Sequence, residues 1–331
     1  MAQEGRGLIC APISLSLAKS LNLEPMVKEN SDEFGTAFTE SIDHIHTTTG
    51  ISADERIMTA RALIDENSTA SDFNRPGHLF PLIARTGGVL VRQGHTEAAV
   101  DLAEMTGSKP AGLICEIMNE DGTMAKGEQL QAFKEKHQLK MISIEALIHY
   151  RKVHETHMHA KAKVKMPTDF GTFDMYGFES DYSHDEIVAI VKGDVQNVEN
   201  VRIHSSCLTG DIFHSQRCDC GAQLEAAMKY INEHGGMIIY LPQEGRGIGL
   251  INKLKAYELI EKGYDTVTAN LALGFDEDLR DYYHAAEILK HFDIEKVNLL
   301  SNNPEKFKGL KHYGIDAVSY THLRAHETGR N

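Results

Sequence analysis

Three cysteines form the part of this sequence that is best suited to chemistry. Cys207 lies in the run His204-Ser-Ser-Cys-Leu-Thr-Gly-Asp, and Cys218 and Cys220 follow as a compact Cys-x-Cys pair. Three thiolates can hold one metal ion, and the lack of a fourth nearby cysteine predicts an open coordination position rather than a closed structural site. A redox or purely structural cluster is the alternative. Polar side chains that flank the trio favour the metal: His204, Asp211 and Asp219.

The other cysteines and a histidine-rich segment are interpreted as structural. Cys10 and Cys115 are isolated in apolar or glycine-rich contexts, which is typical of buried free thiols. His154, His157 and His159 lack the His-Glu-x-x-His spacing of a zinc-binding helix. A solvent-exposed linker helix is the simpler interpretation of that segment.

A glycine-rich turn lies between an apolar run and a helical pattern farther along the chain. It reads Gln243-Glu-Gly-Arg-Gly-Ile-Gly, and its glycines allow backbone amides to approach an anion beside a helix N-terminus. It lacks the Gly-Lys-Ser/Thr ending of a P-loop, so a plain tight turn is the alternative. Cations in nearby loops favour a phosphorylated ligand: Arg202, Arg217, Arg246, Lys253, Arg280 and Lys306.

Five motifs in order resemble the GTP cyclohydrolase II family. Residues 167–318 contain His204-Ser-Ser-Cys-Leu-Thr-Gly-Asp, Arg217-Cys-Asp-Cys-Gly, Gln243-Glu-Gly-Arg-Gly-Ile-Gly-Leu, Gly263-Tyr-Asp-Thr-Val and Asn302-Asn-Pro-x-Lys. The resemblance implies that Cys207, Cys218 and Cys220 bind zinc, and that GTP loses C8 of guanine as formate and also loses pyrophosphate. It further implies that Arg280 attacks the α-phosphorus, Asp278 accepts a proton and Tyr257 assists ring opening. A loop ion pair is the alternative role of Asp278 and Arg280.

The resemblance also implies a set of GTP contacts and a magnesium ion that screens the triphosphate. Ser206 stands where glutamate is frequent in the family, and Ser301 stands where threonine is frequent, so we expect altered but retained binding. The implied contacts are Arg202, Ile203, His204, Ser205, Ser206, Gln223, Glu244, Gly245, Arg246, Thr266, Ser301 and Lys306.

Residues 2–151 resemble a second family, 3,4-dihydroxy-2-butanone 4-phosphate synthase. The matching blocks include Arg75-Pro-Gly-His-Leu-Phe-Pro-Leu, Arg92-Gln-Gly-His-Thr-Glu-Ala and Cys115-Glu-Ile-Met-Asn-Glu. The resemblance implies a magnesium-dependent rearrangement of ribulose 5-phosphate, with His78 and Glu116 in proton transfer and His95 as a magnesium ligand. It implies that substrate is held by Arg92, Gln93, Gly94, His95, Thr96 and Glu116. Taken singly, each histidine is better explained as a structural residue, and only the set indicates the family.

The sequence departs from these families at both ends. The synthase family's opening strand and acidic Arg-Glu-Asn-Glu-Gly-Asp loop, which supplies a metal-binding carboxylate, have no counterpart before Met1. Because a magnesium site that lacks a hard carboxylate binds weakly, we expect this polypeptide to lack or nearly lack synthase activity. Residues 319–331 do not resemble the family's continuation and are expected to be a poorly ordered, non-native tail.

The elements that must position these residues indicate an α+β protein of two domains, each a mixed sheet with flanking helices. We predict domains over residues 1–151 and 165–318, joined by a linker over 152–164. Helical spacing from Leu224 to Ile231 ends at Gly235, residues 237–241 predict a buried strand, and a helix is expected from Leu250 to Gly263. In the first domain, residues 97–105 have a helical pattern.

Composition limits the partners. A formal net charge of −14 argues against a broad nucleic-acid or anionic-membrane surface, and no apolar stretch is long enough for a membrane span. Few cysteines, mostly committed to a metal, favour the reducing cytoplasm. We expect a fused protein of the riboflavin pathway and a homodimer. A zinc-stabilised regulatory module that binds the nucleotide without turnover is the alternative.

Overall fold

The structure is a computed structural model that describes residues 1–182, 185–276 and 278–319. The chain forms two compact units that meet in sequence between Arg151 and Lys152. Each unit has its own sheet and its own hydrophobic core, so the two are described separately.

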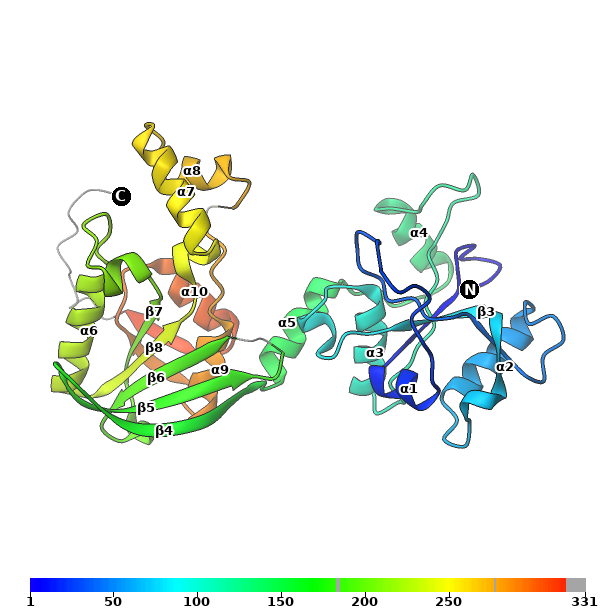
Figure 1. Ribbon diagram of the computed structural model, residues 1–331, viewed down its shortest axis with the longest axis horizontal. Helices are drawn as coiled ribbons and strands as arrows, with labels where there is room; N and C mark the ends of the chain where they lie inside the picture. Colours follow the sequence, from blue (N-terminus) through cyan, green and yellow to red (C-terminus); the bar gives the residue numbers. More distant parts are fainter. Residues whose placement is uncertain (183–184, 277, 320–331) are drawn as a thin grey trace. The chain divides into compact units, whose positions relative to one another are not determined.

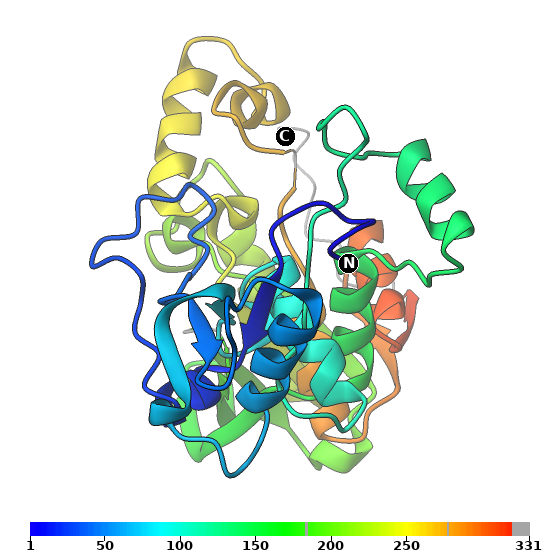
Figure 2. The ribbon, with the colours of Figure 1, turned by 90° about the vertical axis from the view of Figure 1, so that its right-hand side faces the viewer.

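The first unit is built on a small mixed sheet. β1 (Cys10–Ile13) runs parallel to β3 (Phe73–Ile83), and β2 (Ile42–His44) pairs with β3 in the antiparallel direction (Figures 1 and 2). The core between this sheet and the neighbouring helices contains Ile13, Leu21, Ile42, Leu63 and Leu79. The helices of the unit are α1 (Leu15–Ser20), α2 (Ala53–Leu63), α3 (His95–Met105), α4 (Glu128–Lys136) and α5 (Ile144–His154).

The second unit contains a mixed sheet of seven strands in the order β10-β9-β7-β8-β6-β5-β4. The strands from β10 to β8 are parallel to one another, and β6, β5 and β4 continue the sheet in antiparallel pairs. Their bounds are β4 (Met158–Thr168), β5 (Gly171–Ser180), β6 (Glu186–Lys192), β7 (Asn200–Ser205), β8 (Gly236–Leu241), β9 (Lys296–Leu299) and β10 (Asp316–Ser319).

Helices cover both faces of this sheet because successive side chains of a strand point to opposite sides. In β8, Ile238 packs with Ile231 of α6 (Cys220–His234), whereas Met237 and Ile239 belong to the core that includes Ile288 of α9 (Tyr283–His291). α10 (Pro304–His312) lies on the same side as α9 (Figure 1). α7 (Leu250–Glu261) and α8 (Thr266–Ala272) lie side by side in both views (Figures 1 and 2).

The parallel strands bring distant parts of the sequence to one edge of the sheet. The segments that follow the ends of β7, β8 and β9 contain Cys207, the turn at 243–249 and Ser301, respectively. Loops at the carboxyl ends of parallel strands are the usual place for ligands in open sheets. The topology therefore gathers the metal, anion and nucleotide candidates of the second unit at this edge.

The predicted elements around the site are confirmed, as is the α+β class. α6 ends where Gly235 takes a φ of +76°, which a residue without a side chain tolerates. The predicted helix over 97–105 is also present, within α3.

The prediction of a linker helix over residues 152–164 is wrong. α5 ends at His154, and residues from Met158 onward form β4, an edge strand paired with β5. Its side chains after Met158 are largely exposed and include Lys161, Lys163 and Lys165, so the strand looked like a solvent-exposed linker. Charged edge strands of this kind resist pairing with other chains.

Two further predictions concern a membrane span and the C-terminal tail. Across the described residues, no helix combines the length and apolar character needed to cross a membrane. The expected tail at 319–331 lies outside the described residues except for Ser319, whose backbone ends β10.

Candidate functional site

The three cysteines of the second unit converge on one point. Cys207 follows the end of β7 and precedes a short π-helical turn at Leu208–Ile212, whereas Cys218 and Cys220 lie at the start of α6. The three sulfur atoms lie within 4.8 Å of one another, and the Sγ atoms of Cys207 and Cys218 are 3.5 Å apart. The folding of β7 and α6 thus brings together residues that are up to thirteen positions apart in sequence.

This arrangement fits a zinc ion. Zinc–sulfur bonds of about 2.3 Å in a tetrahedron place sulfurs about 3.8 Å apart, close to the observed spacing. The Cα of Gly210 faces the trio, and a Cβ there would lie 2.8 Å from the Cys218 sulfur and 3.1 Å from the Cys207 sulfur. Within the part of the chain that the structure describes, no His, Cys, Asp or Glu joins the trio as a fourth donor. The donor set therefore matches a zinc site with an open position.

Gly210→Ala should reduce zinc binding, because the new methyl group would occupy space beside two of the sulfurs. We expect the zinc content of the purified variant to fall well below one ion per chain while the far-ultraviolet circular dichroism stays unchanged. Gly177→Ala in β5 is the matched control, since a Cβ there meets only the Ala162 side chain at 3.8 Å. Full zinc content in Gly210→Ala would show that the trio does not surround the ion.

A buried lysine contacts the trio. The Lys253 ammonium group on α7 donates to the Cys207 sulfur at 3.0 Å, to Thr209 Oγ1 at 2.9 Å and to Glu244 Oε1 at 2.7 Å. The pKa of Cys207 falls to about 4 because the Cys220 thiol donates to its sulfur, with Lys253 as a further donor, although partial burial opposes this. The same hydrogen bond, together with burial, raises the pKa of Cys220. Sequence reasoning identified Lys253 only as one cation among several.

The loop that carries Cys207 is fixed by a buried carboxylate. Asp211 accepts hydrogen bonds from the Cys207 backbone N–H at 3.0 Å and from the Tyr240 hydroxyl at 2.9 Å. It also lies 3.1 Å from Nε2 of His204, whose ring stacks on Tyr240. His204 is only 2% exposed, and its ring supports the loop that carries Cys207. Ile203, another expected GTP contact, has its side chain in the core.

A cluster of buried cations lies beside the trio. Arg202 and Lys306 are both buried and, within the described residues, neither forms an ion pair. The pKa of Lys306 lies well below its ordinary value because burial removes its hydration and because Arg202 and Arg280 repel its charge. Arg202 donates to the Leu300 carbonyl at 2.8 Å and to Gln223 Oε1 at 2.6 Å. Buried cations without carboxylate partners are suited to an anionic ligand.

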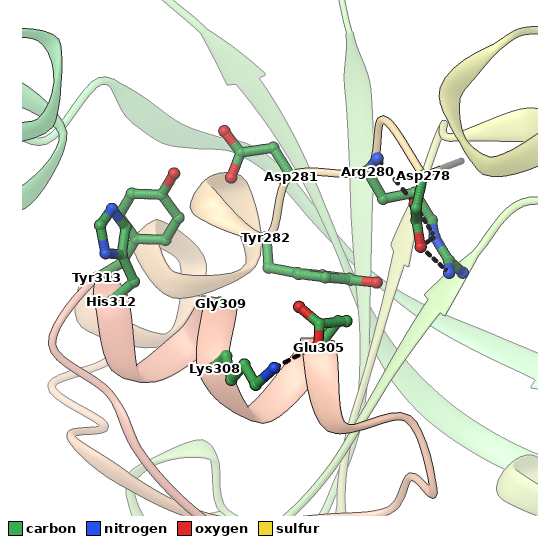
Figure 3. A pocket seen from close by; sticks show the side chains of 9 residues that line it. All are labelled: Asp278, Arg280, Asp281, Tyr282, Glu305, Lys308, Gly309, His312 and Tyr313. Atoms are coloured by element: carbon green, nitrogen blue, oxygen red, sulfur yellow. Dashed lines mark hydrogen bonds and ion pairs between the residues drawn. The ribbon is translucent and has the colours of Figure 1, made fainter. Parts of the chain in front are cut away.

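Arg280 and Asp278 form a bidentate pair at the margin of this cluster. Arg280 Nε lies 2.8 Å from one carboxylate oxygen and an Nη atom lies 2.5 Å from the other (Figure 3). Burial alone would raise the pKa of Asp278, but the Arg280 guanidinium lowers it, so the carboxylate is held ionised. The pair lines a cavity of about 330 Å³, into which Tyr282 also projects.

The glycine-rich turn connects the trio with the Asp278–Arg280 segment. Arg246 has a left-handed φ of +61°, and its carbonyl accepts from the Leu279 N–H at 3.1 Å. Glu244 accepts from the Leu208 N–H at 2.6 Å, next to Cys207. Gly247 has no room for a side chain, because a Cβ would lie 3.0 Å from that of Leu279. The turn therefore contacts both the segment that carries Cys207 and the segment that carries Asp278 and Arg280.

The remaining expected GTP contacts are spread around the same edge. Tyr257 lies one turn after Lys253 on α7, and its ring is 5.0 Å from the Arg217 guanidinium carbon. Ser205 donates to Gln243 at 3.2 Å, and Ser301 Oγ accepts from the Asn303 N–H. Three other expected contacts form no side-chain hydrogen bond with the trio or the cation cluster within the described residues. Gly245 lies in the glycine-rich turn, Ser206 precedes Cys207, and Thr266 begins α8.

The first unit brings its expected catalytic histidine against an aspartate that sequence reasoning missed. His78 Nδ1 lies 2.7 Å from Asp43 Oδ2, and the His78 backbone N–H donates to the other oxygen at 2.9 Å. A side chain at Gly50, where φ is +78°, would overlap the Asp43 carboxylate. The glycine of the Thr-Thr-Gly block thus makes room for this pair, but it does not identify Asp43 from the sequence alone.

The other candidates of the first unit lie just before α3, in its first turn, and in the segment around residue 116. Glu116 accepts from the Leu8 N–H at 2.9 Å. Arg92 is paired with the buried Glu97 at 2.6 Å. Gly94 precedes α3, the exposed His95 begins it, and the buried Thr96 follows; Gln93 is exposed. Among the residues that the structure describes, His95 is not part of any group of three potential metal ligands.

Comparison with known proteins assigns both halves of the chain. A family model described as 3,4-dihydroxy-2-butanone 4-phosphate synthase matches residues 1–150, and one described as GTP cyclohydrolase II matches residues 159–322. The riboflavin biosynthesis protein RibBA of Staphylococcus epidermidis (strain ATCC 12228) is 72% identical over 331 residues, covering 100% of this chain and 84% of that protein. RibBA of Staphylococcus aureus (strain COL) is 71% identical with the same coverage.

A solved structure is also similar to the chain. The crystal structure of RibBX, a two-domain 3,4-dihydroxy-2-butanone 4-phosphate synthase from A. baumannii, has a TM-score of 0.69 and 31% sequence identity. The similarity covers 97% of this chain and 86% of that one.

Proposed function

Since the chain belongs to the RibBA family of bifunctional riboflavin biosynthesis enzymes, we propose that its second domain hydrolyses GTP with a zinc ion held by Cys207, Cys218 and Cys220. The products would be formate, pyrophosphate and 2,5-diamino-6-ribosylamino-4(3H)-pyrimidinone 5′-phosphate. The chain has a 3,4-dihydroxy-2-butanone 4-phosphate synthase domain and a GTP cyclohydrolase II domain.

One observation carries the zinc proposal. The three sulfurs form a compact set to which no fourth donor is added within the described residues, and the set contacts the glycine-rich turn through Lys253 and Glu244. An open position beside a ligand-binding turn is the arrangement of a catalytic rather than a structural site. When bound, zinc would supply a Lewis acid that activates water near neutral pH toward C8 of the guanine.

The cation cluster is proposed to hold the triphosphate. Arg202, Arg280 and Lys306 bring three positive groups together, and magnesium would screen the remaining phosphate charge. Binding of the anion would relieve the mutual repulsion that lowers the pKa of Lys306. GTP binding and charge on this lysine should therefore strengthen each other.

Arg280 is proposed to act on the α-phosphorus. A guanidinium nitrogen would form a bond to that phosphorus, the bond to the bridging oxygen would break, and pyrophosphate would leave. The proton lost from the guanidinium would go to Asp278, whose carboxylate lies within hydrogen-bond distance of that group. Water would later cleave the nitrogen–phosphorus bond and restore Arg280. Tyr257, close to Lys253, would orient groups on the side of the trio.

The test is incubation of the zinc-loaded protein with GTP and magnesium. We expect formate and pyrophosphate in equal amounts, together with the ultraviolet change that accompanies formation of a diaminopyrimidine. Saturable GTP binding without any of these products would instead favour the regulatory module. Inhibition by a zinc chelator, and recovery on adding zinc, would separate loss of metal from loss of fold.

For the first domain we propose ribulose 5-phosphate chemistry with His78 and Glu116 in proton transfer, but with weak turnover. The His78–Asp43 contact supports a role in proton transfer, because a carboxylate fixes the orientation of the imidazole. Within the described residues, His95 belongs to no group of three potential metal ligands, which supports weak magnesium binding. We expect formate production from ribulose 5-phosphate to be at least about 100-fold slower than that from GTP. Comparable rates would contradict this proposal.

A cytoplasmic location and a homodimer remain part of the proposal. Thiolate ligands need a reducing compartment to stay available for zinc, which favours the cytoplasm. Light scattering coupled to size-exclusion chromatography would test the homodimer, with a mass near twice 36.8 kDa as the expected result.

A further inference from the structure

Lys253 has an unusual position for a lysine. It lies in the second turn of α7, it is 9% exposed, and its ammonium group has three side-chain acceptors at 2.7–3.0 Å. A buried ammonium normally needs such compensation, and here one of the acceptors is the Cys207 sulfur. The remaining two, Glu244 and Thr209, belong to the glycine-rich turn and to the loop after Cys207.

The charges at this point explain why a lysine is present. Three thiolates and one zinc ion together carry a charge of −1, and Glu244, which also accepts from the ammonium group, adds a second negative charge. Without Lys253, these two negative groups would lack a common cation in a largely buried space. The one ammonium group offsets their repulsion and satisfies an acceptor of each.

We propose that Lys253 is a positioning residue that sets the donor strength of the Cys207 sulfur toward zinc and couples the metal to the Glu244 turn. The inference rests on the zinc assignment of the proposed function. A hydrogen bond to a thiolate withdraws electron density from the sulfur, so the zinc ion keeps more of its positive charge and activates water more strongly. The same ammonium group holds Glu244 in place, and Glu244 accepts from the Leu208 N–H beside Cys207.

Lys253→Met tests this role because it keeps the length of the side chain and removes its charge and hydrogen bonds. Competition with a chromogenic chelator should show zinc affinity reduced about 10- to 100-fold, the range typical of outer-shell partners of metal ligands. In the cobalt-substituted protein, the sulfur-to-cobalt charge-transfer band should move to longer wavelength, because the Cys207 sulfur loses its hydrogen bond. Neither measurement requires GTP turnover.

Two further variants keep the test informative if Lys253→Met does not fold. Lys253→Arg retains the charge and should show a smaller loss of zinc affinity than Lys253→Met. Lys253→Gln retains a hydrogen-bond donor without the charge, and its zinc affinity should lie between those of the Arg and Met variants. The matched control is Lys255→Met, which removes a charge from an exposed position on the same helix. It should leave both the zinc affinity and the cobalt spectrum unchanged.

The outcomes separate the inference from the proposed function. Wild-type zinc affinity and an unshifted charge-transfer band in a folded Lys253 variant would overturn the inference, whatever the activity of the protein. A shifted band with weaker zinc binding in the variant, together with a zinc-loaded wild-type protein that yields no product from GTP, would support the role of Lys253 and contradict the proposed function.

Discussion

Cys220→Ser should abolish stoichiometric zinc binding and formate release from GTP. A serine hydroxyl is not ionised near neutral pH, so one of the three anionic donors is lost. Dividing the roughly 10–16 kcal/mol of a structural zinc site among four ligands gives about 2.5–4 kcal/mol for each, or about 10²–10³ in affinity. Metal analysis of dialysed protein and a formate assay would measure the two effects.

Cys115→Ser is the matched control for this exchange. Cys115 lies in the first unit, its thiol donates to the Glu116 carbonyl, and it is far from the trio in sequence. The same chemical change there should leave zinc content and GTP hydrolysis unchanged. If Cys220→Ser kept one zinc ion per chain, the ion would have to be held elsewhere and the proposed site would be wrong.

Arg280→Lys should stop pyrophosphate release while zinc stays bound. Lysine keeps the positive charge but cannot form the bidentate pair with Asp278 or supply the guanidinium nitrogen to the α-phosphorus. Loss of a nucleophile costs more than the loss of one transition-state hydrogen-bond donor, so we expect a fall in rate of about 10³-fold or more. A coupled pyrophosphate assay on zinc-loaded protein would measure it.

Lys229→Arg makes the reverse exchange on the exposed side of α6, where Lys229 pairs with Glu225, and should have no effect. A modest loss in Arg280→Lys, below about tenfold, would indicate that Arg280 only binds the phosphate electrostatically. In that case Asp278 and Arg280 would be a loop ion pair, the alternative that the sequence leaves open.

The residues of the candidate metal site were predictable because their chemistry is carried by residue type and local spacing. The trio, the glycine-rich turn and the helix from Leu250 each have a signature within a few residues, and the structure places them at one edge of the sheet. The order of the strands was not predictable in the same way. Parallel pairing of β7 with β8 and β9 depends on contacts between segments that are far apart in sequence.

Contacts across long sequence separations also explain what was missed. Lys253 and Cys207 are 46 positions apart, and His78 and Asp43 are 35 positions apart, so no local pattern pairs them. The strand β4 was missed for a different reason. As an edge strand it buries little besides Met158. Apolar and polar residues do alternate from Met158 to Met166, but the many lysines and histidines favour its interpretation as a solvent-exposed linker helix.

The place of the His204 ring was also not predictable from its motif. The motif suggested contact with GTP, but it does not show which way a side chain on β7 points. The structure buries the ring against Tyr240 and Asp211, where it supports the loop that carries Cys207. The GTP contact of His204 stays a prediction, and the structure adds this supporting role of its side chain.

The most direct test of the account is X-ray absorption spectroscopy at the zinc edge on the purified, folded protein, combined with metal analysis. We predict one zinc ion per chain with three sulfur neighbours at about 2.3 Å and one lighter oxygen or nitrogen neighbour that changes when GTP is added. A folded protein without zinc, or a zinc ion enclosed by four protein donors and unaffected by GTP, would contradict the proposed catalytic site.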